Sequence, residues 1–409
     1  MSERSPALWF AVFVVFIDAL GMSIIIPIMP SLLGELTGQT VAETAMIGGV
    51  LTAVYAVNQF LFGPIVGALS DRFGRRPLIL LSLAALVVDY LLMAVAWNVL
   101  LLFIGRFLAG LAGASYTVAT AYIADVSEKS KRSENFGLVG AAFGVGFIIG
   151  PVLGGLAAGI DVRAPLYLAA GICFVGVLFG IFILPESLKE ENRRAFSLRS
   201  ANPFSALMRA FKMKGLQAFL LVMTLLSLAD FTYPAIWAYW GTQSLGWSEA
   251  MIGLTLAYYG IGTAIVQGGL IRWIIPAIGE PKTIVLGLIV SALSFFLFAF
   301  ASQTWMVLII IPISCLSHVA GAALTGMMTR LVSDSEQGEL QGVLGAIGAV
   351  TSIVSSLVMT AIFFKLADDQ GAYFPGGSFL VAGVLVLISF VPLRAALMHR
   401  APKTNEPAV

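Results

Sequence analysis

The feature that most constrains this chain is a succession of apolar stretches, each long enough to cross a lipid bilayer as a helix. The hydrocarbon core of a bilayer is about 30 Å thick, and a helix of roughly 20 apolar residues crosses it. Only 11% of the residues are charged and 59% are hydrophobic, so a soluble fold of this composition would lack a polar surface. We therefore expect an all-α integral membrane protein with twelve transmembrane helices. The predicted spans are 7–30, 45–69, 77–96, 99–123, 134–158, 164–184, 215–241, 250–273, 282–301, 304–328, 338–364 and 374–397.

A polar stretch divides the predicted spans into two groups of six. Residues 185–214 are rich in lysine and arginine and contain no apolar run long enough to span a membrane. The two groups resemble each other, since FGLVGAAFG at Phe136–Gly144 is matched 205 positions later by QGVLGAIGA at Gln341–Ala349. The repeat predicts two pseudo-symmetric six-helix bundles with a substrate site near mid-membrane between them, operated by alternating access. The predicted domains are the bundles 1–184 and 215–400, the cytosolic linker 185–214 and a short cytosolic tail at 401–409.

The placement of positive charge predicts which side of the membrane each loop occupies. If the amino terminus is cytosolic, 20 of the 23 lysines and arginines fall on the cytosolic side, as the positive-inside rule demands. Arg106 lies within a span, and only Arg163 and Lys365 fall outside. The apolar run 7–29 is too long for the core of a signal peptide, so we interpret it as a retained first helix. We expect a protein of a bacterial inner membrane with both termini in the cytosol.

Several classes of function receive no support from the sequence. A net charge of +1 argues against a nucleic-acid-binding protein, because nothing basic enough is present outside the loops. The chain contains no phosphate-binding G-x-x-x-x-G-K-S/T and no H-E-x-x-H or G-x-S-x-G, so we expect neither an ATP-driven pump nor an enzyme. Cys173 and Cys315 form no metal-ligand pair. We expect no metal and no cofactor, and a monomer that works with protons, membrane lipid and a small-molecule substrate.

The loop between the second and third spans carries a dense motif, GALSDRFGRRP from Gly67 to Pro77. Its glycines permit close approach of helix ends, its arginines suit an anionic membrane surface, and its acid can pair with them or meet a helix N-terminus. Topogenic charge alone is the alternative interpretation. The motif resembles the signature loop of the major facilitator superfamily, which implies a conformational latch at the cytosolic gate. The residues predicted to act there are Gly67, Asp71, Arg72, Gly74, Arg75 and Arg76.

The second half contains what resembles a decayed copy of this loop. The segment Gly269–Lys282 keeps Arg272, Gly279 and Lys282, whereas the acid of the motif is missing.

The fifth span contains GFIIGPVLGG, which resembles the signature of the drug/proton antiporters of that superfamily. Glycines permit close helix contact and a proline bends a span, so packing without any coupling role is the alternative. Leu20–Pro30 in the first span, and Arg106 followed by Gly110 in the fourth, resemble two further antiporter motifs. The residues of the signature are Gly146, Gly150, Pro151, Gly154 and Gly155.

Within that superfamily the first half is similar to the tetracycline/proton antiporters. The similar residues are Phe16–Pro30, the pair Asn58 and Gln59, Asp89–Leu92 and Gly105–Ala114. The resemblance implies proton-driven export of a drug-like molecule. The second half departs from that family, in which a histidine of helix 8 and an aspartate of helix 9 serve coupling, because Thr263 and Ser291 stand at the apparent equivalents. The substrate can therefore be another drug-like molecule or a metabolite.

Four charged residues lie deep in predicted spans, where a charged side chain costs at least about 2.5 to 3.5 kcal/mol. At 1.5 Å rise per residue, Asp18, Asp89 and Asp230 lie about 16, 18 and 22 Å into their helices. Arg106 cannot lose its proton to escape burial, so it needs an acid nearby, which Asp18 or Asp89 can supply. A buried carboxylate near an arginine can have a proton affinity that changes with water access, as antiport requires. A static ion pair is the alternative.

The second half offers two candidate sites of its own. Asp230 shares a predicted helical face with Tyr233 and Trp237, and this face can bind substrate or pack as an aromatic stripe. His318, predicted near the middle of the tenth span, can replace the missing histidine or form a helix contact. Proton coupling is thus assigned to Asp18, Asp89, Arg106, Asp230 and His318, and the substrate wall to Tyr55, Asn58, Gln59, Tyr233, Trp237 and Tyr258.

Together these features predict a proton-coupled secondary transporter. Inward proton flow protonates Asp18 or Asp230 from outside, displaces the substrate there and lets the emptied carrier return, so that substrate leaves the cell. Proton-coupled uptake of a metabolite is the main alternative, because symport and antiport can use the same acids. A nontransporting receptor on the same scaffold is a more remote one.

Overall fold

A computed structural model of the protein describes residues 6–112, 115–128, 131–193, 196, 202–210, 212–213, 215–333, 336–368 and 373–398. The predicted tail 401–409 lies outside these residues, as do 194, 195, 197–201, 211 and 214 of the predicted linker. Within them every regular element is a helix. The helices are α1 (Pro6–Ile24), α2 (Met29–Thr37), α3 (Val41–Phe73), α4 (Arg75–Ala94), α5 (Val99–Ala112), α6 (Ser115–Val126), α7 (Arg132–Ala158), α8 (Ala164–Ile183), α9 (Phe204–Ala210), α10 (Gln217–Asp230), α11 (Thr232–Leu245), α12 (Glu249–Ile265), α13 (Ile271–Ile278), α14 (Glu280–Ala299), α15 (Thr304–Leu316), α16 (Val319–Thr329), α17 (Gln337–Leu366) and α18 (Gly377–Met398).

Twelve helical stretches of the described chain are long and apolar enough to cross a membrane, which confirms the prediction of twelve spans. Most predicted boundaries agree with the observed ones to within a few residues. Some candidate spans include two helices that follow each other in the sequence: α5 and α6, α10 and α11, and α15 and α16. A turn of π-helix at Val266–Leu270 joins α12 to α13.

The first predicted span, 7–30, is shorter as a helix than expected. α1 ends at Ile24, the next residues form tight turns, and α2 begins at Met29. Pro27 has no N–H to donate to the carbonyl of Ser23, so the helix cannot continue through it. The chain instead forms hydrogen bonds between residues three apart, and the N–H of Ile26 donates to the Ser23 carbonyl at 3.2 Å.

Two other spans are interrupted beside residues predicted to be functional. α10 ends at Asp230 and α11 begins at Thr232, because Pro234 lacks the N–H that would bond to the Asp230 carbonyl. This break at Phe231 separates Asp230 from Tyr233 and Trp237, so the face predicted to carry all three stays a prediction. His318 also lies at a break rather than inside a continuous helix, in the turn between α15 and α16.

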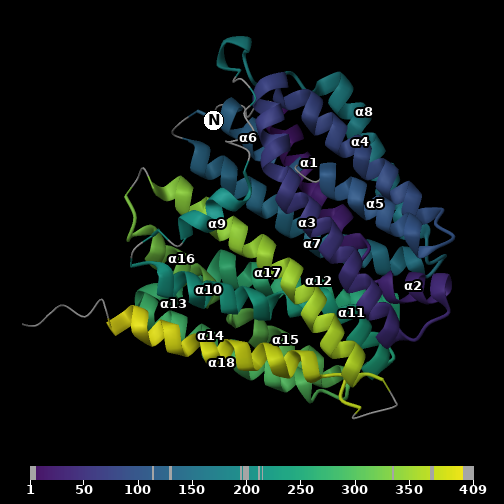
Figure 1. The fold of residues 1–409 in the computed structure, drawn as a ribbon, viewed down its shortest axis with the longest axis vertical. Coiled ribbons are helices and arrows are strands. Elements are labelled where there is room, and N and C mark those ends of the chain that lie inside the picture. Colours follow the sequence, from purple (N-terminus) through teal and green to yellow (C-terminus); the bar gives the residue numbers. More distant parts are fainter. Residues whose placement is uncertain are drawn as a thin grey trace, which may run out of the picture. The chain divides into compact units, whose positions relative to one another are not determined.

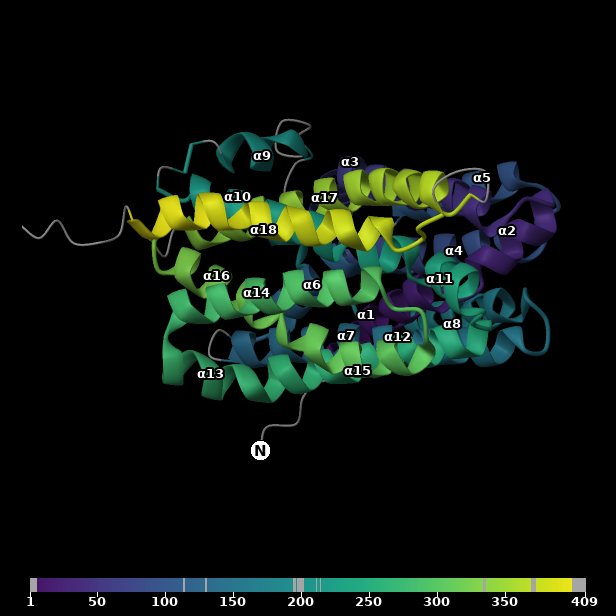
Figure 2. The ribbon, with the colours of Figure 1, turned by 90° about the horizontal axis from the view of Figure 1, so that it is seen from below.

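By contacts between residues the chain divides into two compact units. Unit 1 comprises Met1–Pro203, Tyr233–Ile261 and Ile353–Pro375, and unit 2 comprises Phe204–Thr232, Gly262–Ser352 and Gly376–Val409. These units do not follow the two halves of the sequence, because α11, most of α12 and the end of α17 belong to unit 1. In unit 2, α14 packs along α18 (Figures 1 and 2).

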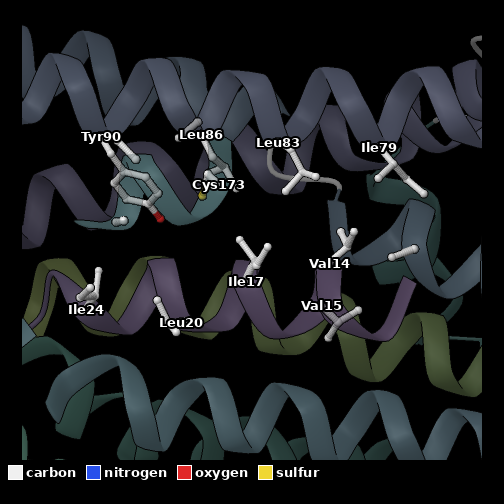
Figure 3. Packing of buried hydrophobic residues seen from close by; sticks show 14 of the residues in the cluster. Val14, Val15, Ile17, Leu20, Ile24, Ile79, Leu83, Leu86, Tyr90 and Cys173 are labelled. Atoms are coloured by element: carbon white, nitrogen blue, oxygen red, sulfur yellow. The ribbon is translucent and has the colours of Figure 1, made fainter. Parts of the chain in front are cut away.

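The core of unit 1 is built around α1, which packs against α6, α7 and α8. Its apolar side chains meet those of α4 across a shared layer (Figure 3). Ile17 of α1 points toward Leu83 and Leu86 of α4, and all three are at most 2% exposed. Cys173 of α8 fills the same layer and is also buried. α1 is buried on almost all sides, so its packing fixes the position of Asp18.

The internal repeat is visible in the helix boundaries themselves. α4 begins at Arg75 and α14 at Glu280, and 280 − 75 = 205, the offset found in the sequence. Further boundaries separated by the same 205 residues are Phe73 and Ile278, Ala94 and Ala299, Val99 and Thr304, and Arg132 and Gln337. Positions 205 apart are therefore structural equivalents in this region of the two halves.

Arg163, one of the two cations that break the charge bias, has a local structural role. Its Nη1 donates to the carbonyls of Ala94 and Ala96 at 2.9 and 2.7 Å, at the carboxyl end of α4. Its Nε lies 3.9 Å from a carboxylate oxygen of Glu35 in α2. A cation is favourable at the C-terminus of a helix, where carbonyls lack helical partners.

Candidate functional site

Unit 1 contains a cavity of about 360 Å³ beside Asp18. α1, α3, α6 and α7 each contribute to its wall. The lining residues are Asp18, Met22, Gln59, Gly63, Tyr116, Thr117 and Phe143. Asp18 is only 2% exposed, and its Oδ1 accepts no hydrogen bond from any residue that the structure describes. A buried carboxylate oxygen without a partner is costly, so this group is suited to bind a proton or a ligand donor.

One wall of this cavity is aromatic. The rings of Tyr116 and Phe143 meet edge to face with centroids 5.8 Å apart, and Phe143 stacks on Phe147 at 5.5 Å. Sequence reasoning found Asp18 and Gln59 but missed the aromatic residues of α6 and α7. Two other lining residues, Met22 and Gly63, could have been predicted, because they follow Asp18 and Gln59 by one helical turn.

A second buried acid, Asp89, is paired with Arg106. Nη2 of Arg106 in α5 donates to Oδ2 of Asp89 in α4, and the two residues are 6% and 0% exposed. Of the two acids predicted as possible partners, the structure places Asp89 in the pair. Gly105 makes room for it, because a Cβ at that position would lie 2.6 Å from Oδ1 of Asp89.

Aromatic rings surround the guanidinium of this pair. The Arg106 cation lies 5.5 Å from the ring centre of Tyr55 and 5.8 Å from that of Tyr90. The hydroxyl of Tyr90 packs against Gly21 of α1, one turn beyond Asp18. Tyr55 also accepts a hydrogen bond from Nε2 of Gln59 at 3.3 Å. The ion pair is thus connected to the cavity wall through Tyr55 and Gln59.

The other predicted wall residue of α3 has a different environment. Nδ2 of Asn58 donates to the carbonyl of Val54 in its own helix at 2.8 Å. The side chain packs where Gly110 of α5 approaches, and the residue is 5% exposed. Among Tyr55, Asn58 and Gln59, only Gln59 lines the cavity.

The predicted wall residues of α11 and α12 belong to an aromatic cluster in unit 1. Trp237 is 2% exposed, and its indole N–H donates to Oγ1 of Thr255 at 3.0 Å. Its ring packs against those of Trp240 and Trp247, with centroids 5.6 and 5.8 Å away. Such a satisfied, buried tryptophan is typical of a packed core.

Tyr233 lies at the edge of this cluster. Its ring centre is 6.1 Å from that of Trp237 and 5.4 Å from that of Tyr259. The sequence pointed to Tyr258 as a wall residue, but that side chain is exposed, and its neighbour Tyr259 makes the contact.

In unit 2 the residues at the apparent family positions are hydroxyls. Oγ1 of Thr263 donates to Sγ of Cys315 at 3.8 Å, which joins the spans of α12 and α15. Ser291 is 2% exposed and its Oγ has no partner among the described residues. Asp230 and His318 lie at the helix breaks described above.

The glycines of the fifth-span signature bring α7 into backbone contact with two helices. Gly146, Gly150 and Gly154 face α1, where Ser23 Oγ donates to the Gly146 carbonyl at 3.2 Å. On the other side, Gly155 faces the backbone of Glu249 at the start of α12. The carbonyl of Pro151 lies where a side chain on Gly253 would be. A Cβ at any of these glycines would meet backbone, so packing accounts for them, and a part in coupling stays a prediction.

The predicted latch loop between α3 and α4 is closed by a network centred on Arg75. Its Nη1 lies 2.6 Å from Oδ1 of Asp71, and its Nε lies 3.1 Å from Oδ2 of Asp125 at the end of α6. The same Nη1 donates to Oγ of Ser70 at 2.6 Å. Gly74 turns the chain with φ 104°, a conformation that favours glycine.

The carboxylate of Glu186 caps the helix that follows this turn. It accepts hydrogen bonds from the backbone N–H groups of Arg75 and Arg76 at 2.8 and 3.2 Å. An acid is favourable there because the first N–H groups of a helix lack helical partners. Sequence reasoning missed Glu186 and Asp125, which lie outside the contiguous motif.

The remaining residues of the loop motif are more peripheral. Nη2 of Arg76 donates to the carbonyl of Ile181 at 2.7 Å, and the Arg72 guanidinium lies 5.1 Å from the ring centre of Phe73. Gly67 faces α6, where the nearest atom to a Cβ would be a methyl of Thr117 at 3.9 Å.

Comparison with known proteins identifies the family. The model of the Major Facilitator Superfamily matches residues 11–239 and 218–408. The class C tetracycline resistance protein of Escherichia coli is 38% identical over 390 residues, covering 95% of this chain and 97% of that protein. The class G protein of Vibrio anguillarum is 35% identical, covering 96% and 98%. Multidrug resistance protein 2 of Bacillus subtilis is 28% identical, covering 91% of each.

Solved structures show the same fold at lower identity. The human organic anion transporter MFSD10 has a TM-score of 0.72 at 22% identity, covering 95% of this chain and 100% of that one. The nucleoside transporter NupG has a TM-score of 0.77 at 12% identity, covering 96% and 99%. With twelve spans, a signature loop and a matching family model over nearly its whole length, the chain belongs to the major facilitator superfamily.

Proposed function

We propose that the protein exports a small, drug-like organic molecule in exchange for protons, by alternating access. The observation that carries the proposal is the carboxylate of Asp18, which lines a cavity with one oxygen free of any described partner. Relatives named for tetracycline and multidrug resistance favour export over uptake. By this reasoning the protein acts as a monomer of a bacterial inner membrane, with cytosolic termini and two six-helix bundles at 1–184 and 215–400.

Asp18 is the group at which proton and substrate compete. A charged carboxylate in a membrane-embedded cavity is costly, so it gains by binding either a proton or the donor group of a substrate. A proton arriving from outside neutralises Asp18 and releases the substrate, and the emptied carrier returns to the inner side. Asp230 is the candidate for a second coupling group, because it ends α10 at a break within the span.

The ion pair of Asp89 and Arg106 has a positioning role in this scheme. Each charge neutralises the other, so neither needs to change protonation for the pair to persist. The Arg106 cation holds the ring of Tyr55, and Tyr55 holds Gln59 at the cavity. The pair thereby fixes a polar group that contacts substrate.

The cavity wall favours a substrate with an aromatic or flat apolar body and a few polar groups. Its aromatic side is formed by Tyr116 and Phe143, and its polar groups include Asp18, Gln59 and Thr117. Tetracycline is one molecule to test, although Thr263 and Ser291 depart from the pattern of the tetracycline/proton antiporters.

The test is proton movement in proteoliposomes on addition of tetracycline, ethidium or another candidate drug. We expect the parent protein to move protons with at least one of them and Asp18→Asn to lose this response at least tenfold. Asp161→Asn, at an exposed turn, is the control and keeps the response. Asp230→Asn tests the second coupling group. If substrate moves equally well without a proton gradient, and Asp18→Asn matches the parent, the proposal is wrong.

A further inference from the structure

The decayed loop of the second half contains an ion pair that a motif search does not reveal. Glu280 begins α14 and pairs with Arg330, the residue that follows α16. In the first half, Arg75 begins α4 and pairs with Asp125 at the end of α6. The offset of 205 relates both members, since 280 − 75 = 205 and 330 − 125 = 205. We call these pairs the first clasp (Arg75, Asp125) and the second clasp (Glu280, Arg330).

The two clasps share their backbone and differ in the order of their charges. Gly74 and Gly279 precede them with φ 104° and 78° and ψ 160° and 158°. The N–H of Gly74 donates to the Ser70 carbonyl at 3.1 Å, and that of Gly279 donates to the Ile275 carbonyl at 2.8 Å. The two halves therefore have the same glycine turn before equivalent helices, but the acid stands where the first half has its base, and the base where it has its acid. The acid that the second loop lacks at the motif position is supplied by Glu280.

The exchange of charges changes how each clasp interacts with its helix ends. A helix N-terminus favours negative charge and a C-terminus favours positive charge. Glu280 at the start of α14 and Arg330 after α16 both satisfy this preference. Arg75 at the start of α4 and Asp125 in the last turn of α6 both oppose it. The first clasp needs additional partners, and it has them in Asp71, Ser70 and the capping carboxylate of Glu186.

Packing between the helices reinforces this difference. Gly287 of α14 lies directly against Ala320 and the Ser317 carbonyl beside α16, and a Cβ there would meet them at 2.7 and 2.9 Å. Gly326 of α16 lies beside the Glu280 carboxylate, with 3.1 Å from its Cβ position to Oε1. The first half has Ser82 and Ala121 at the equivalent positions. Close backbone contact at Gly287, together with the approach of the Glu280 carboxylate to Gly326, holds α14 against α16.

We propose that the second clasp, Glu280 with Arg330, stays closed throughout the transport cycle and positions α14 against α16, whereas the first clasp opens and closes. This inference rests on the proposed function, because it assumes that the protein changes conformation during proton-driven transport. Each charge of the second clasp is stabilised by its own helix end, and no third group among the described residues takes part in the pair. The first clasp depends on several partners from three segments, so a movement of any one of them weakens it.

Cross-linking in proteoliposomes tests the contrast. The variants are Glu280→Cys with Arg330→Cys, and Arg75→Cys with Asp125→Cys as the matched pair. Each is treated with a short bis-methanethiosulfonate, with and without an imposed proton gradient. The parent chain controls for the reagent, since Cys173 and Cys315 are buried. We expect the cross-linking rate of the cysteine pair at the second clasp to change less than twofold when the proton gradient is imposed. The cross-linking rate of the pair at the first clasp should fall at least fivefold.

A fivefold change at the second clasp, or an unchanged rate at both, overturns the proposal. If either cysteine pair fails to fold, charge exchange replaces it. Glu280→Arg and Arg330→Glu each place like charges together, and the double variant restores an ion pair whose charges oppose the helix ends, so we expect it to recover part of the thermal stability that either single variant loses. No recovery means that these side chains do not form a clasp. Proton movement with Asp18→Asn tests the proposed function separately, so the failure of one result is distinguishable from that of the other.

Discussion

Asp18 and Asp89 are two acids of the same unit with nearly equal burial, 2% and 0% exposed, but with different surroundings. Asp89 accepts from Arg106 in an ion pair, although its own Oδ1 also lacks a donor, whereas Asp18 has no ion-pair partner among the described residues and lines a cavity. Burial alone therefore does not tell a coupling acid from a structural one. The partner decides, because a paired charge is stable as it stands and an unpaired one gains by binding a proton or a ligand.

The largest expected effect is on folding, at the paired acid. Arg106→Gln leaves Asp89 charged, buried and without its cation, which we expect to cost about 3–5 kcal/mol of unfolding free energy. Denaturant unfolding of the purified protein in detergent measures it. The double variant Asp89→Asn with Arg106→Gln removes both charges and should recover most of the loss. If Arg106→Gln costs under about 1 kcal/mol, Asp89 and Arg106 are not a buried structural pair.

The next effect is on transport, at the unpaired acid. Asp18→Asn removes the group on which proton and substrate compete, so we expect proton-coupled transport to fall about a hundredfold, equivalent to roughly 2.7 kcal/mol. Unfolding free energy should stay the same or rise, because the variant removes a buried charge that has no partner. Thermal unfolding beside the proteoliposome assay measures both quantities. A loss of stability as large as that of Arg106→Gln would erase the distinction between the two acids.

A smaller effect is expected at the glycine that admits the paired acid. Gly105→Ala places a Cβ 2.6 Å from Oδ1 of Asp89, and the displaced carboxylate should cost about 1–3 kcal/mol of unfolding free energy. Gly144→Ala is the matched control, since nothing lies within 4 Å of its Cβ position. Chemical denaturation of both variants gives the difference. Equal stabilities would mean that Asp89 is not held tightly against α5.

The smallest effect is expected at the residue that connects the two regions. Tyr55→Phe keeps the ring against Arg106 but removes the hydroxyl that accepts from Gln59. We expect a loss of about 0.5–1.5 kcal/mol in apparent substrate affinity, with little change in stability. Measurement of KM and maximal rate separates positioning from coupling. A lower maximal rate at unchanged KM would place Tyr55 in coupling instead.

The sequence predicted the twelve spans well, because a bilayer imposes length and hydropathy on every helix. It predicted that Arg106 needs an acid but could not choose between Asp18 and Asp89, since that choice depends on how α4 and α5 pack. The face predicted for Asp230 and Tyr233 stays a prediction, because helical spacing was extended through the break that Pro234 causes.

Residues outside contiguous motifs were the hardest to predict. Tyr116 and Phe143 look like ordinary membrane-helix aromatics until α6 and α7 bring them to Asp18. Glu186 is more than a hundred residues from the loop that it caps. The second clasp escaped notice for a different reason, since its charges are exchanged and a motif search compares identities rather than interactions.

Arg163 affects how strongly the charge distribution supports the proposed orientation. Its guanidinium is engaged by the carbonyls of Ala94 and Ala96, so its position is explained by a local structural need. A prediction of topology from lysine and arginine counts should include only the cations whose position is not already required by the fold. With Arg163 set aside, Lys365 in the last turn of α17 is the remaining cation that falls on the predicted outer side, and cytosolic termini stay a prediction.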